Sequence, residues 1–345
     1  MTLDTFHQRL LSLGTKPQHC GYFYRSLFGV MPRIKPDDPK FPLALRKALP
    51  ELYAIIDGAL VVADSHQAEE KDSLKLLFKL HDGHTIESVL LPRDGVCVSS
   101  QVGCAVGCAF CMTGKGGLER QLSSAEIAAQ YVAATRIKPD IKKVVLMGMG
   151  EPSHNLAAVK EAVAFMGDVA GLAHKQIVVS TVGDERLFDA LPTWSVKPAL
   201  ALSLHTTDFE KRKKLLKNAP ALTPEYLLQR TLDYAEQTKY PAQIEWTLLA
   251  SINDTFEEVE RLAELVAGRY AMVNFIAVNP TEGSDFKRPD QEHIEDLITV
   301  LRRKGIVATL RDSAAQDIEG GCGQLRARHL SARQEVPISL EKMPS

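Results

Sequence analysis

The chain has 345 residues, a net charge of −2 at pH 7, 45% hydrophobic residues and 24% charged residues. This composition is ordinary for a folded globular protein, so disorder is not the starting assumption, and the net charge excludes a globally basic nucleic-acid binder. The first residues lack the basic and apolar regions of a signal peptide, and no apolar run reaches the roughly 18 residues of a membrane span. We therefore expect a cytoplasmic protein that does not associate with membranes.

The segment 1–57 is expected to form a small helical accessory domain. Apolar clusters around Leu10, Phe23 and Leu45 are separated by breaker residues at 14–17 and by a loop rich in proline, aspartate and lysine at 32–42. Lysine and arginine are frequent in this segment. They can grip a phosphate backbone or form an ordinary solvated surface, and the sequence leaves both interpretations open.

Residues 58–94 are typical of a β-hairpin. Leu74, Leu76 and Phe78 alternate with lysines, and the Asp82-Gly83 pair favours a tight turn before a returning strand at 86–91. Glu87 lies in that returning strand. Taken alone, it is an exposed strand carboxylate that nothing distinguishes.

Four of the six cysteines fall between residues 97 and 111. Cys104, Cys108 and Cys111 have the spacing CxxxCxxC directly after an apolar segment that is typical of a strand. Three thiolates on a short loop can bind three irons of a 4Fe–4S cluster and leave the fourth iron open to a small molecule. S-adenosylmethionine suits that open iron, because its amino and carboxylate groups can chelate it.

The same cysteines have two simpler interpretations. Structural zinc sites usually have paired ligands, and neither a second cysteine pair nor a nearby histidine follows here. A disulfide framework is unusual in a long chain without a secretory segment. The spacing therefore favours the cluster over zinc.

From residue 95 onward, short β-rich runs alternate with helical patterns. A capping box begins at Ser123, Thr223-Pro224 begins another helix, and Asp254 is expected to open a third. This alternation predicts an α/β fold, a partial (β/α)6 barrel over 95–330 with a tail at 331–345. The candidate strands are 95–99, 143–148, 175–180, 197–204, 243–249, 271–278 and 305–310.

Polar and glycine residues follow the ends of these strands, where a barrel of this kind places its site. Glu151 lies in a Gly-Met-Gly-Glu-Pro turn and offers an acceptor for an ammonium group. Ser180, Ser203 and Asn279 follow three other strands and can hydrogen-bond a ribose or a carboxylate. Each residue alone is a weak indication of a binding site, but their shared position at strand ends makes all of them candidate binding residues.

Cys322 is surrounded by glycines near the end of the barrel region, and Cys97 lies beside the cysteine loop without being needed as a ligand. We expect Cys322 to be exposed. Two spare thiols near one site suggest covalent thiol chemistry that closes with a disulfide.

Together these motifs resemble the RlmN/Cfr family of radical-SAM enzymes, which methylate adenine in RNA. The resemblance rests on ordered stretches and extends from the hairpin to Leu325, while the N-terminal unit is similar to the family's accessory domain. The stretches are CVSSQVGC at 97–104, FCMTG at 110–114, GMGEP at 148–152, SLH at 203–205 and CGQL at 322–325.

The resemblance implies a mechanism. One S-adenosylmethionine methylates Cys322, and a second is cleaved at the cluster to a radical that takes a hydrogen from that methyl group. The carbon then bonds to adenine, Glu87 serves as proton acceptor, and Cys97 attacks the Cys322 sulfur to release the product and leave a disulfide. The matching cofactor contacts are Gly150, Glu151, Ser180, Ser203, Leu204, His205 and Asn279.

Some positions depart from the family pattern, among them Gln121, the stretch 216–220 and the glycine pair before Cys322. They indicate a divergent paralogue. We expect methylation at adenine carbon 2 of rRNA or tRNA by a monomer that receives electrons from a flavodoxin or ferredoxin. Carbon 8, another radical-SAM substrate, and a metal-stabilised RNA-binding module without activity are the alternatives.

Overall fold

The computed structural model describes residues 2–27, 31–69, 73–279, 281, 283–311 and 315–326. Within these residues, ten strands form one open sheet in the order β1-β2-β3-β4-β7-β8-β9-β10-β11-β12. The strands are β1 (Leu60–Gln67), β2 (Leu74–Leu80), β3 (Thr85–Leu91), β4 (Gly95–Cys97), β7 (Lys143–Leu146), β8 (Ile177–Thr181), β9 (Ala199–Ser203), β10 (Ala242–Leu248), β11 (Ala271–Ala277) and β12 (Val307–Arg311).

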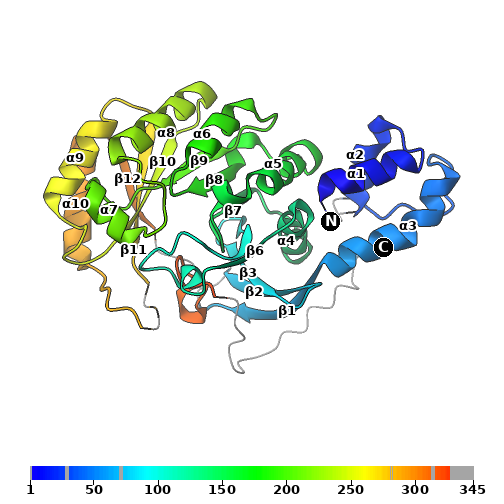
Figure 1. The fold of residues 1–345 in the computed structure, drawn as a ribbon, viewed down its shortest axis with the longest axis horizontal. Helices are drawn as coiled ribbons and strands as arrows, with labels where there is room; N and C mark the ends of the chain where they lie inside the picture. The colour runs from blue at the N-terminus through cyan, green and yellow to red at the C-terminus, as the bar shows by residue number, and fades with distance from the viewer. Residues whose placement is uncertain are drawn as a thin grey trace.

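The sheet is parallel from β4 to β12, which confirms the predicted α/β fold with six strand–helix units (Figure 1). Helices connect the parallel strands and pack on the outer face. They are α4 (Ser124–Ile137), α5 (Leu156–Ala164), α6 (Glu185–Ala190), α7 (Phe209–Leu215), α8 (Pro224–Thr238), α9 (Phe256–Val266) and α10 (Gln291–Arg303). The sheet does not close on itself, because β1 and β12 lie at its two ends.

The helix starts follow the capping signals of the sequence. The hydroxyl of Ser123 accepts from the Glu126 N–H and the Glu126 carboxylate accepts in return, which completes the capping box of α4. Thr223 caps α8, with proline at its first position. The expected start at Asp254 was one residue early, since the hydroxyl of Thr255 caps α9 by accepting from the Glu258 N–H.

Three helices precede the sheet: α1 (Leu3–Ser12), α2 (Pro17–Leu27) and α3 (Leu43–Ala59). They are joined to the rest of the molecule by long-range hydrogen bonds. The Leu3 N–H donates to Ser124 Oγ at 2.8 Å, and Arg25 Nε donates to the Val169 carbonyl at 2.9 Å. The helical unit therefore packs beside α4 and α5 (Figure 1).

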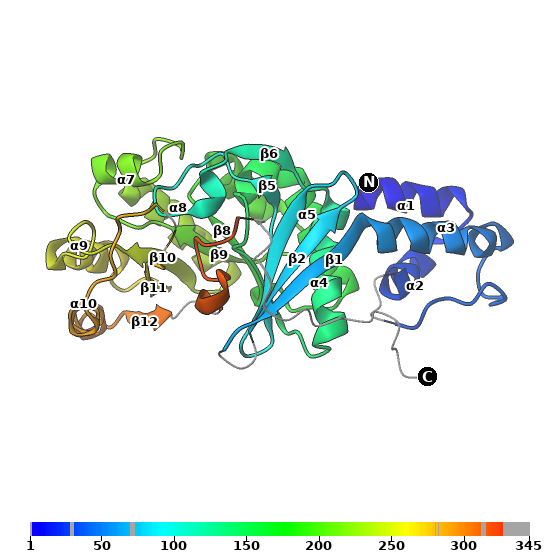
Figure 2. The ribbon, with the colours of Figure 1, turned by 90° about the horizontal axis from the view of Figure 1, so that it is seen from below.

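The hairpin predicted within 58–94 is present as β2 and β3, which pair antiparallel across the Asp82-Gly83 turn. A further strand, β1, was not predicted; it follows α3 directly and pairs antiparallel with β2 (Figure 2). Because β3 also pairs with β4, the extension continues the barrel sheet. The tail at 331–345 lies outside the described residues. Among those described, no helix is long and apolar enough to cross a membrane.

Candidate active site

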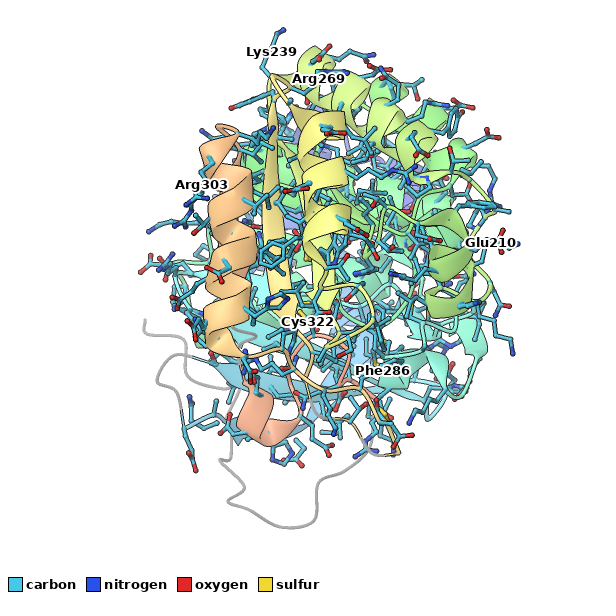
Figure 3. The ribbon with its side chains drawn as sticks, turned by 90° about the vertical axis from the view of Figure 1, so that its left-hand side faces the viewer. Glu210, Lys239, Arg269, Phe286, Arg303 and Cys322 are labelled. Atoms are coloured by element: carbon cyan, nitrogen blue, oxygen red, sulfur yellow. The ribbon has the colours of Figure 1, made fainter. Side chains whose placement is uncertain are left out.

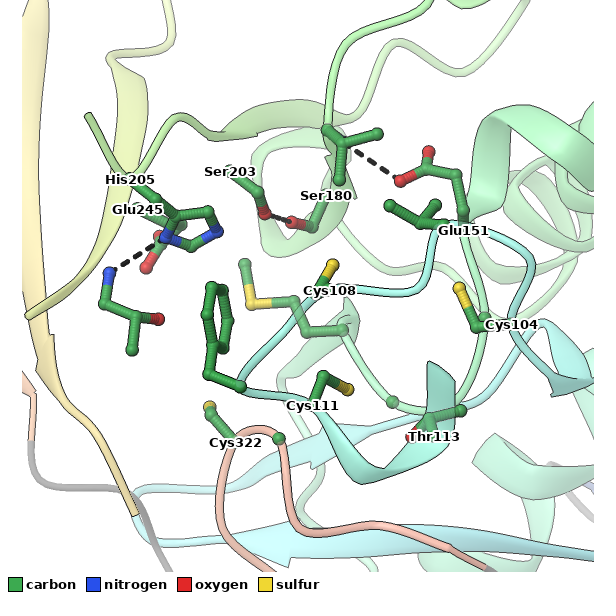
Figure 4. A pocket seen from close by; sticks show the side chains of 18 of the residues that line it. Cys104, Cys108, Cys111, Thr113, Glu151, Ser180, Ser203, His205, Glu245 and Cys322 are labelled. Carbon is green, nitrogen blue, oxygen red and sulfur yellow. Dashed lines mark hydrogen bonds between the residues drawn. The ribbon is translucent and has the colours of Figure 1, made fainter. Parts of the chain in front are cut away.

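The candidate residues meet at the carboxyl ends of the parallel strands. Cys322 and Phe286 lie at this end, whereas Lys239 and Arg269 lie at the opposite end of the sheet (Figure 3). A cavity there is lined by the three cysteines, by residues following β7, β8 and β9, by two side chains of β10 and by Cys322 (Figure 4). The strand ends thus bring together residues that lie far apart in the sequence.

The cysteine loop is closed at its base by a small hairpin, which the sequence did not reveal. β5 (Gln101–Gly103) pairs antiparallel with β6 (Leu118–Gln121), and the cysteines lie between them. The Cys104 N–H donates to the Gly117 carbonyl at 2.9 Å. Gly103 has a φ of +75°, and a Cβ there would lie 2.0 Å from that same carbonyl oxygen, so the position requires glycine.

A second segment, at the end of α7, supports the loop from the other side. The Ala109 N–H donates to the Leu215 carbonyl at 2.8 Å, and the Asn218 N–H donates to the Val106 carbonyl at 2.9 Å. Asn218 Nδ2 also donates to the Ala105 carbonyl at 2.8 Å. The stretch 216–220, where the sequence departs from its family pattern, therefore still positions the cysteine loop.

The three thiols fit an iron–sulfur cluster by the chemistry of their donor set. Burial raises the pKa of Cys104 to about 12 and holds the pKa of Cys108 well above its usual range, with the neighbouring cysteines adding to both effects. Thiolates so close together in a buried site require bound cations, and metal binding displaces their protons. Among the described residues, no three His, Cys, Asp or Glu side chains converge on a single ion, but cubane ligands bind different irons.

Glu151 lies at the cysteine end of the cavity (Figure 4). Its Oε1 accepts from Thr181 Oγ1 at 2.7 Å and from the Ser153 N–H at 3.0 Å, and its Oε2 accepts from the Val182 N–H at 2.9 Å. The preceding Gly150 has a φ of +106°, and a Cβ would lie 2.6 Å from the side chain of Gln101. These contacts fix the carboxylate, and Oε2 retains capacity for a further donor.

His205 and two serines form the opposite part of the cavity wall (Figure 4). Ser180 Oγ and Ser203 Oγ lie 3.3 Å apart. Burial, assisted by the charge of Arg212, lowers the pKa of His205 to about 3, so its ring is neutral. Because His205 Nδ1 accepts from the Thr247 N–H at 2.9 Å, we assign the ring proton to Nε2.

Two of the residues expected to contact the cofactor, Leu204 and Asn279, form hydrogen bonds to other parts of the protein. The Leu204 side chain is buried in the core, and its N–H donates to the Glu245 carbonyl at 3.0 Å. Asn279 Nδ2 donates to the Cys322 carbonyl at 2.9 Å. Asn279 therefore holds the C-terminal segment beside the cavity.

Cys322 is exposed, as expected, and lines the cavity. Its segment is bound to the cysteine loop itself: the Met112 N–H donates to the Gly323 carbonyl at 2.7 Å, and Thr113 Oγ1 donates to the Leu325 carbonyl at 2.7 Å. Cys97, on β4, is buried. Burial raises the pKa of its thiol, and the nearby Cys322 side chain raises that pKa further.

Glu87, on β3, lies behind this C-terminal segment and is 1% exposed. Its Oε1 is 3.2 Å from Nζ of Lys75, which is equally buried. Its Oε2 accepts from the Arg326 N–H at 2.8 Å. The carboxylate that looked unremarkable in the sequence is therefore a member of a buried ion pair next to the segment that carries Cys322.

Two residues that sequence reasoning missed also shape the site. Arg212 belongs to the charged stretch 210–214, whose residue types are typical of a solvated helix face, yet it is 3% exposed and donates to the carbonyls of Val182 and Ser203. Burial lowers its pKa to about 10, although Cys108 and Glu151 oppose this effect. Asn253, fully buried, donates from Nδ2 to the His205 carbonyl at 2.6 Å.

Comparison with known proteins places the chain among radical-SAM proteins. Residues 98–266 match the profile of the Radical SAM superfamily. A probable RNA methyltransferase from Chromobacterium violaceum is 49% identical over 95% of this chain and 94% of its own length. Another, from Aromatoleum aromaticum, is 51% identical over 96% of this chain and 94% of its own length.

A solved structure extends the similarity to the whole fold. The radical SAM methyltransferase from Sphaerobacter thermophilus superposes with a TM-score of 0.82 and 32% identity, covering 95% of this chain and 98% of that chain. Similarity over nearly the full length includes the N-terminal helices, the strand extension and the barrel. The chain belongs to the RlmN/Cfr family of radical-SAM RNA methyltransferases.

Proposed function

We propose that this enzyme methylates carbon 2 of an adenine in rRNA or tRNA through a methylated Cys322. The observation that carries the proposal is the position of Cys322, which is exposed, lines the same cavity as Cys104, Cys108 and Cys111, and lies near the buried thiol of Cys97. A methyl carrier and a resolving thiol need this proximity to each other and to the cysteine loop.

In this proposal Cys104, Cys108 and Cys111 hold a 4Fe–4S cluster. The cluster and S-adenosylmethionine together supply a methyl group and, after electron transfer from a flavodoxin or ferredoxin, a 5′-deoxyadenosyl radical. Glu151 receives the ammonium group of S-adenosylmethionine, and Ser180, Ser203 and His205 contact its nucleoside. Gly150 allows the backbone to approach S-adenosylmethionine closely. Leu204 and Asn279 contribute to its binding indirectly, because the Leu204 N–H donates to the Glu245 carbonyl and Asn279 donates to the Cys322 carbonyl.

The thiols and Glu87 perform the remaining steps. The Cys322 sulfur accepts the methyl group, and the 5′-deoxyadenosyl radical would remove one hydrogen atom from it, so that the remaining CH2 carbon bonds to the adenine carbon. The adduct would then lose one electron, returned to the cluster, and the proton of the adenine carbon, which Glu87 takes. The Cys97 thiolate attacks the Cys322 sulfur and forms a disulfide; the carbon–sulfur bond breaks with its electron pair on the CH2 carbon, which takes up a proton and leaves as the methyl group of the base. Such thiol chemistry suits a reducing compartment, which we propose is the cytoplasm.

Units outside the cavity are proposed to bind the RNA substrate. We propose that residues 1–57 form an accessory domain, next to the extension at 58–94 and the barrel at 95–330, and that its basic residues contact phosphates. Methylation at carbon 8 by the same chemistry is the second candidate, because the thiols serve either carbon equally.

Mass spectrometry tests the proposal. Protein purified with a full cluster is digested, and we expect the Cys322 peptide to carry one added methyl group. Total RNA from cells with and without the enzyme is then digested and examined for 2-methyladenosine and 8-methyladenosine. An unmethylated Cys322 in cluster-loaded protein supplied with S-adenosylmethionine contradicts the two-cysteine mechanism, and the identity of the nucleoside decides between the two carbons.

A further inference from the structure

We propose that Glu245 is a binding residue for S-adenosylmethionine, and that the ribose hydroxyls donate hydrogen bonds to its carboxylate. The inference rests on the proposed binding of this molecule in the cavity of Cys104, Cys108 and Cys111. It adds an acidic group on β10 to the expected contacts.

The carboxylate of Glu245 has one oxygen held and the other unused. Oε1 accepts from Asn274 Nδ2 at 2.8 Å and lies 3.4 Å from Nη1 of Arg311. Oε2 is buried and has no hydrogen-bond partner among the described residues. A buried carboxylate oxygen without a hydrogen-bond donor carries an uncompensated desolvation penalty. Because Glu245 lines the cavity, a ligand that donates a hydrogen bond to Oε2 removes this penalty and is bound more tightly.

The register of the sheet places Glu245 in a row of polar side chains. Ser203 of β9, Glu245 of β10, Asn274 of β11 and Thr309 of β12 are paired in register. Thr309 Oγ1 donates to Asn274 Oδ1 at 3.0 Å, so the amide that holds Glu245 is itself oriented by the next strand. Two members of this row, Glu245 and Ser203, line the cavity and lie side by side on neighbouring strands (Figure 4).

The chemistry of these two groups fits a vicinal diol. An ionised carboxylate only accepts hydrogen bonds, and each ribose hydroxyl can donate one. Neighbouring strands are about 4.8 Å apart, which allows Ser203 and Glu245 to receive the two hydroxyls of one sugar. The edge of adenine suits Glu245 less well, because its amino group lies beside ring nitrogens that are acceptors and repel a carboxylate. An acidic side chain receives the ribose of dinucleotides in the same way.

The position of Glu245 in the cavity agrees with the place expected for the ribose of S-adenosylmethionine. Cys104 and Glu151 lie at one end, where the amino and carboxylate groups of S-adenosylmethionine belong, and Glu245 lies beside His205 on the other side (Figure 4). Arg311, which is 33% exposed, offsets part of the charge of Glu245 from the far side. The carboxyl group is thus preorganised by Asn274, and its second oxygen is without a donor among the described residues.

Ligand binding tests this assignment without relying on turnover. Cluster-loaded enzyme is titrated calorimetrically under anaerobic conditions with S-adenosylhomocysteine, which has the same ribose but no methyl group to transfer. The 2′-deoxy and 3′-deoxy analogues and the analogue without the adenine amino group are titrated in parallel. E245Q is compared with the wild type, and Q243M is the matched control, because Gln243 also contacts Arg311 from β10 but does not line the cavity.

We expect the wild type to bind at least one deoxy analogue about ten- to hundredfold more weakly than S-adenosylhomocysteine, as for a hydrogen bond to a charged group. In E245Q that penalty should largely disappear, whereas Q243M should retain it. Equal binding of all analogues by the wild type overturns the proposal, and this result does not depend on how well E245Q folds. A penalty that E245Q leaves unchanged also overturns it, as does an effect of E245Q that depends only on the adenine amino group.

The role of Glu245 and the binding of S-adenosylmethionine in the cavity can be tested separately. Tight binding of S-adenosylhomocysteine without any dependence on Glu245 removes only the ribose assignment. Absence of binding to cluster-loaded wild type contradicts the proposed use of the cavity as well.

Discussion

Glu87 accepts a hydrogen bond from the backbone N–H of Arg326 at 2.8 Å, although 239 positions separate the two residues. Arg326 follows the segment that carries Cys322, and Glu87 lies on the strand next to that of Cys97. This contact therefore connects the proposed proton acceptor to the segment of the proposed methyl carrier, while the pairing of β3 with β4 places Glu87 beside the strand of the proposed resolving thiol. An adenine that reaches Oε2 of Glu87 shares this oxygen with the Arg326 N–H or displaces it.

The first prediction concerns the ion pair that Glu87 forms with Lys75. Both side chains are 1% exposed, so K75M leaves a buried carboxylate without its counter-ion. We expect K75M to lower the free energy of unfolding by about 3–5 kcal/mol, measured by urea denaturation. The double variant K75M/E87L should recover most of this loss, because it removes both charges.

A surface pair provides the control. Lys213 and Glu210 are 3.3 Å apart but exposed, so K213M should change the unfolding free energy by less than about 0.5 kcal/mol. Equal losses for K75M and K213M would show that the Lys75–Glu87 contact contributes no more than a solvated pair.

The second prediction separates the two thiols. C322A removes the methyl carrier and should abolish RNA methylation. C97A should still form the bond between Cys322 and RNA but fail to release it, because no thiol attacks the Cys322 sulfur. We expect a covalent protein–RNA species in denaturing gels of C97A, removable by ribonuclease. C20A is the matched control, since Cys20 lies in α2 and its thiol donates to the Lys16 carbonyl of the same helical unit; identical gels for C97A and C20A would exclude Cys97 as the resolving thiol.

The third prediction uses two glycines of the same loop. In G103A the new methyl group would lie 2.0 Å from the Gly117 carbonyl oxygen at a positive φ, so the β5–β6 hairpin must distort. We expect a loss of at least about 2 kcal/mol in stability together with poor iron and sulfide incorporation. Gly116 has an ordinary φ and nothing within 4 Å of a Cβ, so G116A should load its cluster normally. Normal cluster content in G103A would mean that the hairpin is not needed to shape the cysteine loop.

The fourth prediction concerns Arg212. Its buried guanidinium interacts electrostatically with Cys108 and Glu151, and a positive charge near a thiolate-bound cluster favours the reduced form. We expect R212M to lower the reduction potential of the cluster, measured by potentiometric titration with electron paramagnetic resonance, and R212K to restore much of it. K214M removes an exposed charge from the same helix and should leave the potential nearly unchanged, because water screens it. A potential in R212M equal to that of K214M contradicts this electrostatic role.

The sequence alone predicted the parallel α/β part of the fold and marked the residues that carry a spacing signal, but it revealed neither β1 nor the β5–β6 hairpin. The parallel strands are short apolar runs bounded by turn residues, and their ends coincide with Glu151, Ser180 and Ser203 because a parallel sheet gathers its carboxyl ends at one edge. The CxxxCxxC spacing is a local property of residues 104–111. Such local features can be predicted without knowing which residues pack against them.

The tertiary structure alone decided which charges are buried. Arg212 belongs to a run of basic residues that is indistinguishable in sequence from a solvated helix face, and only its packing against the segments of Val182 and Ser203 removes it from water. Glu245 lies in a strand whose residues are all buried, so no alternation marks the side that faces the cavity. Lys75 and Glu87 form a pair across two strands through register, and register depends on contacts that span the whole sheet.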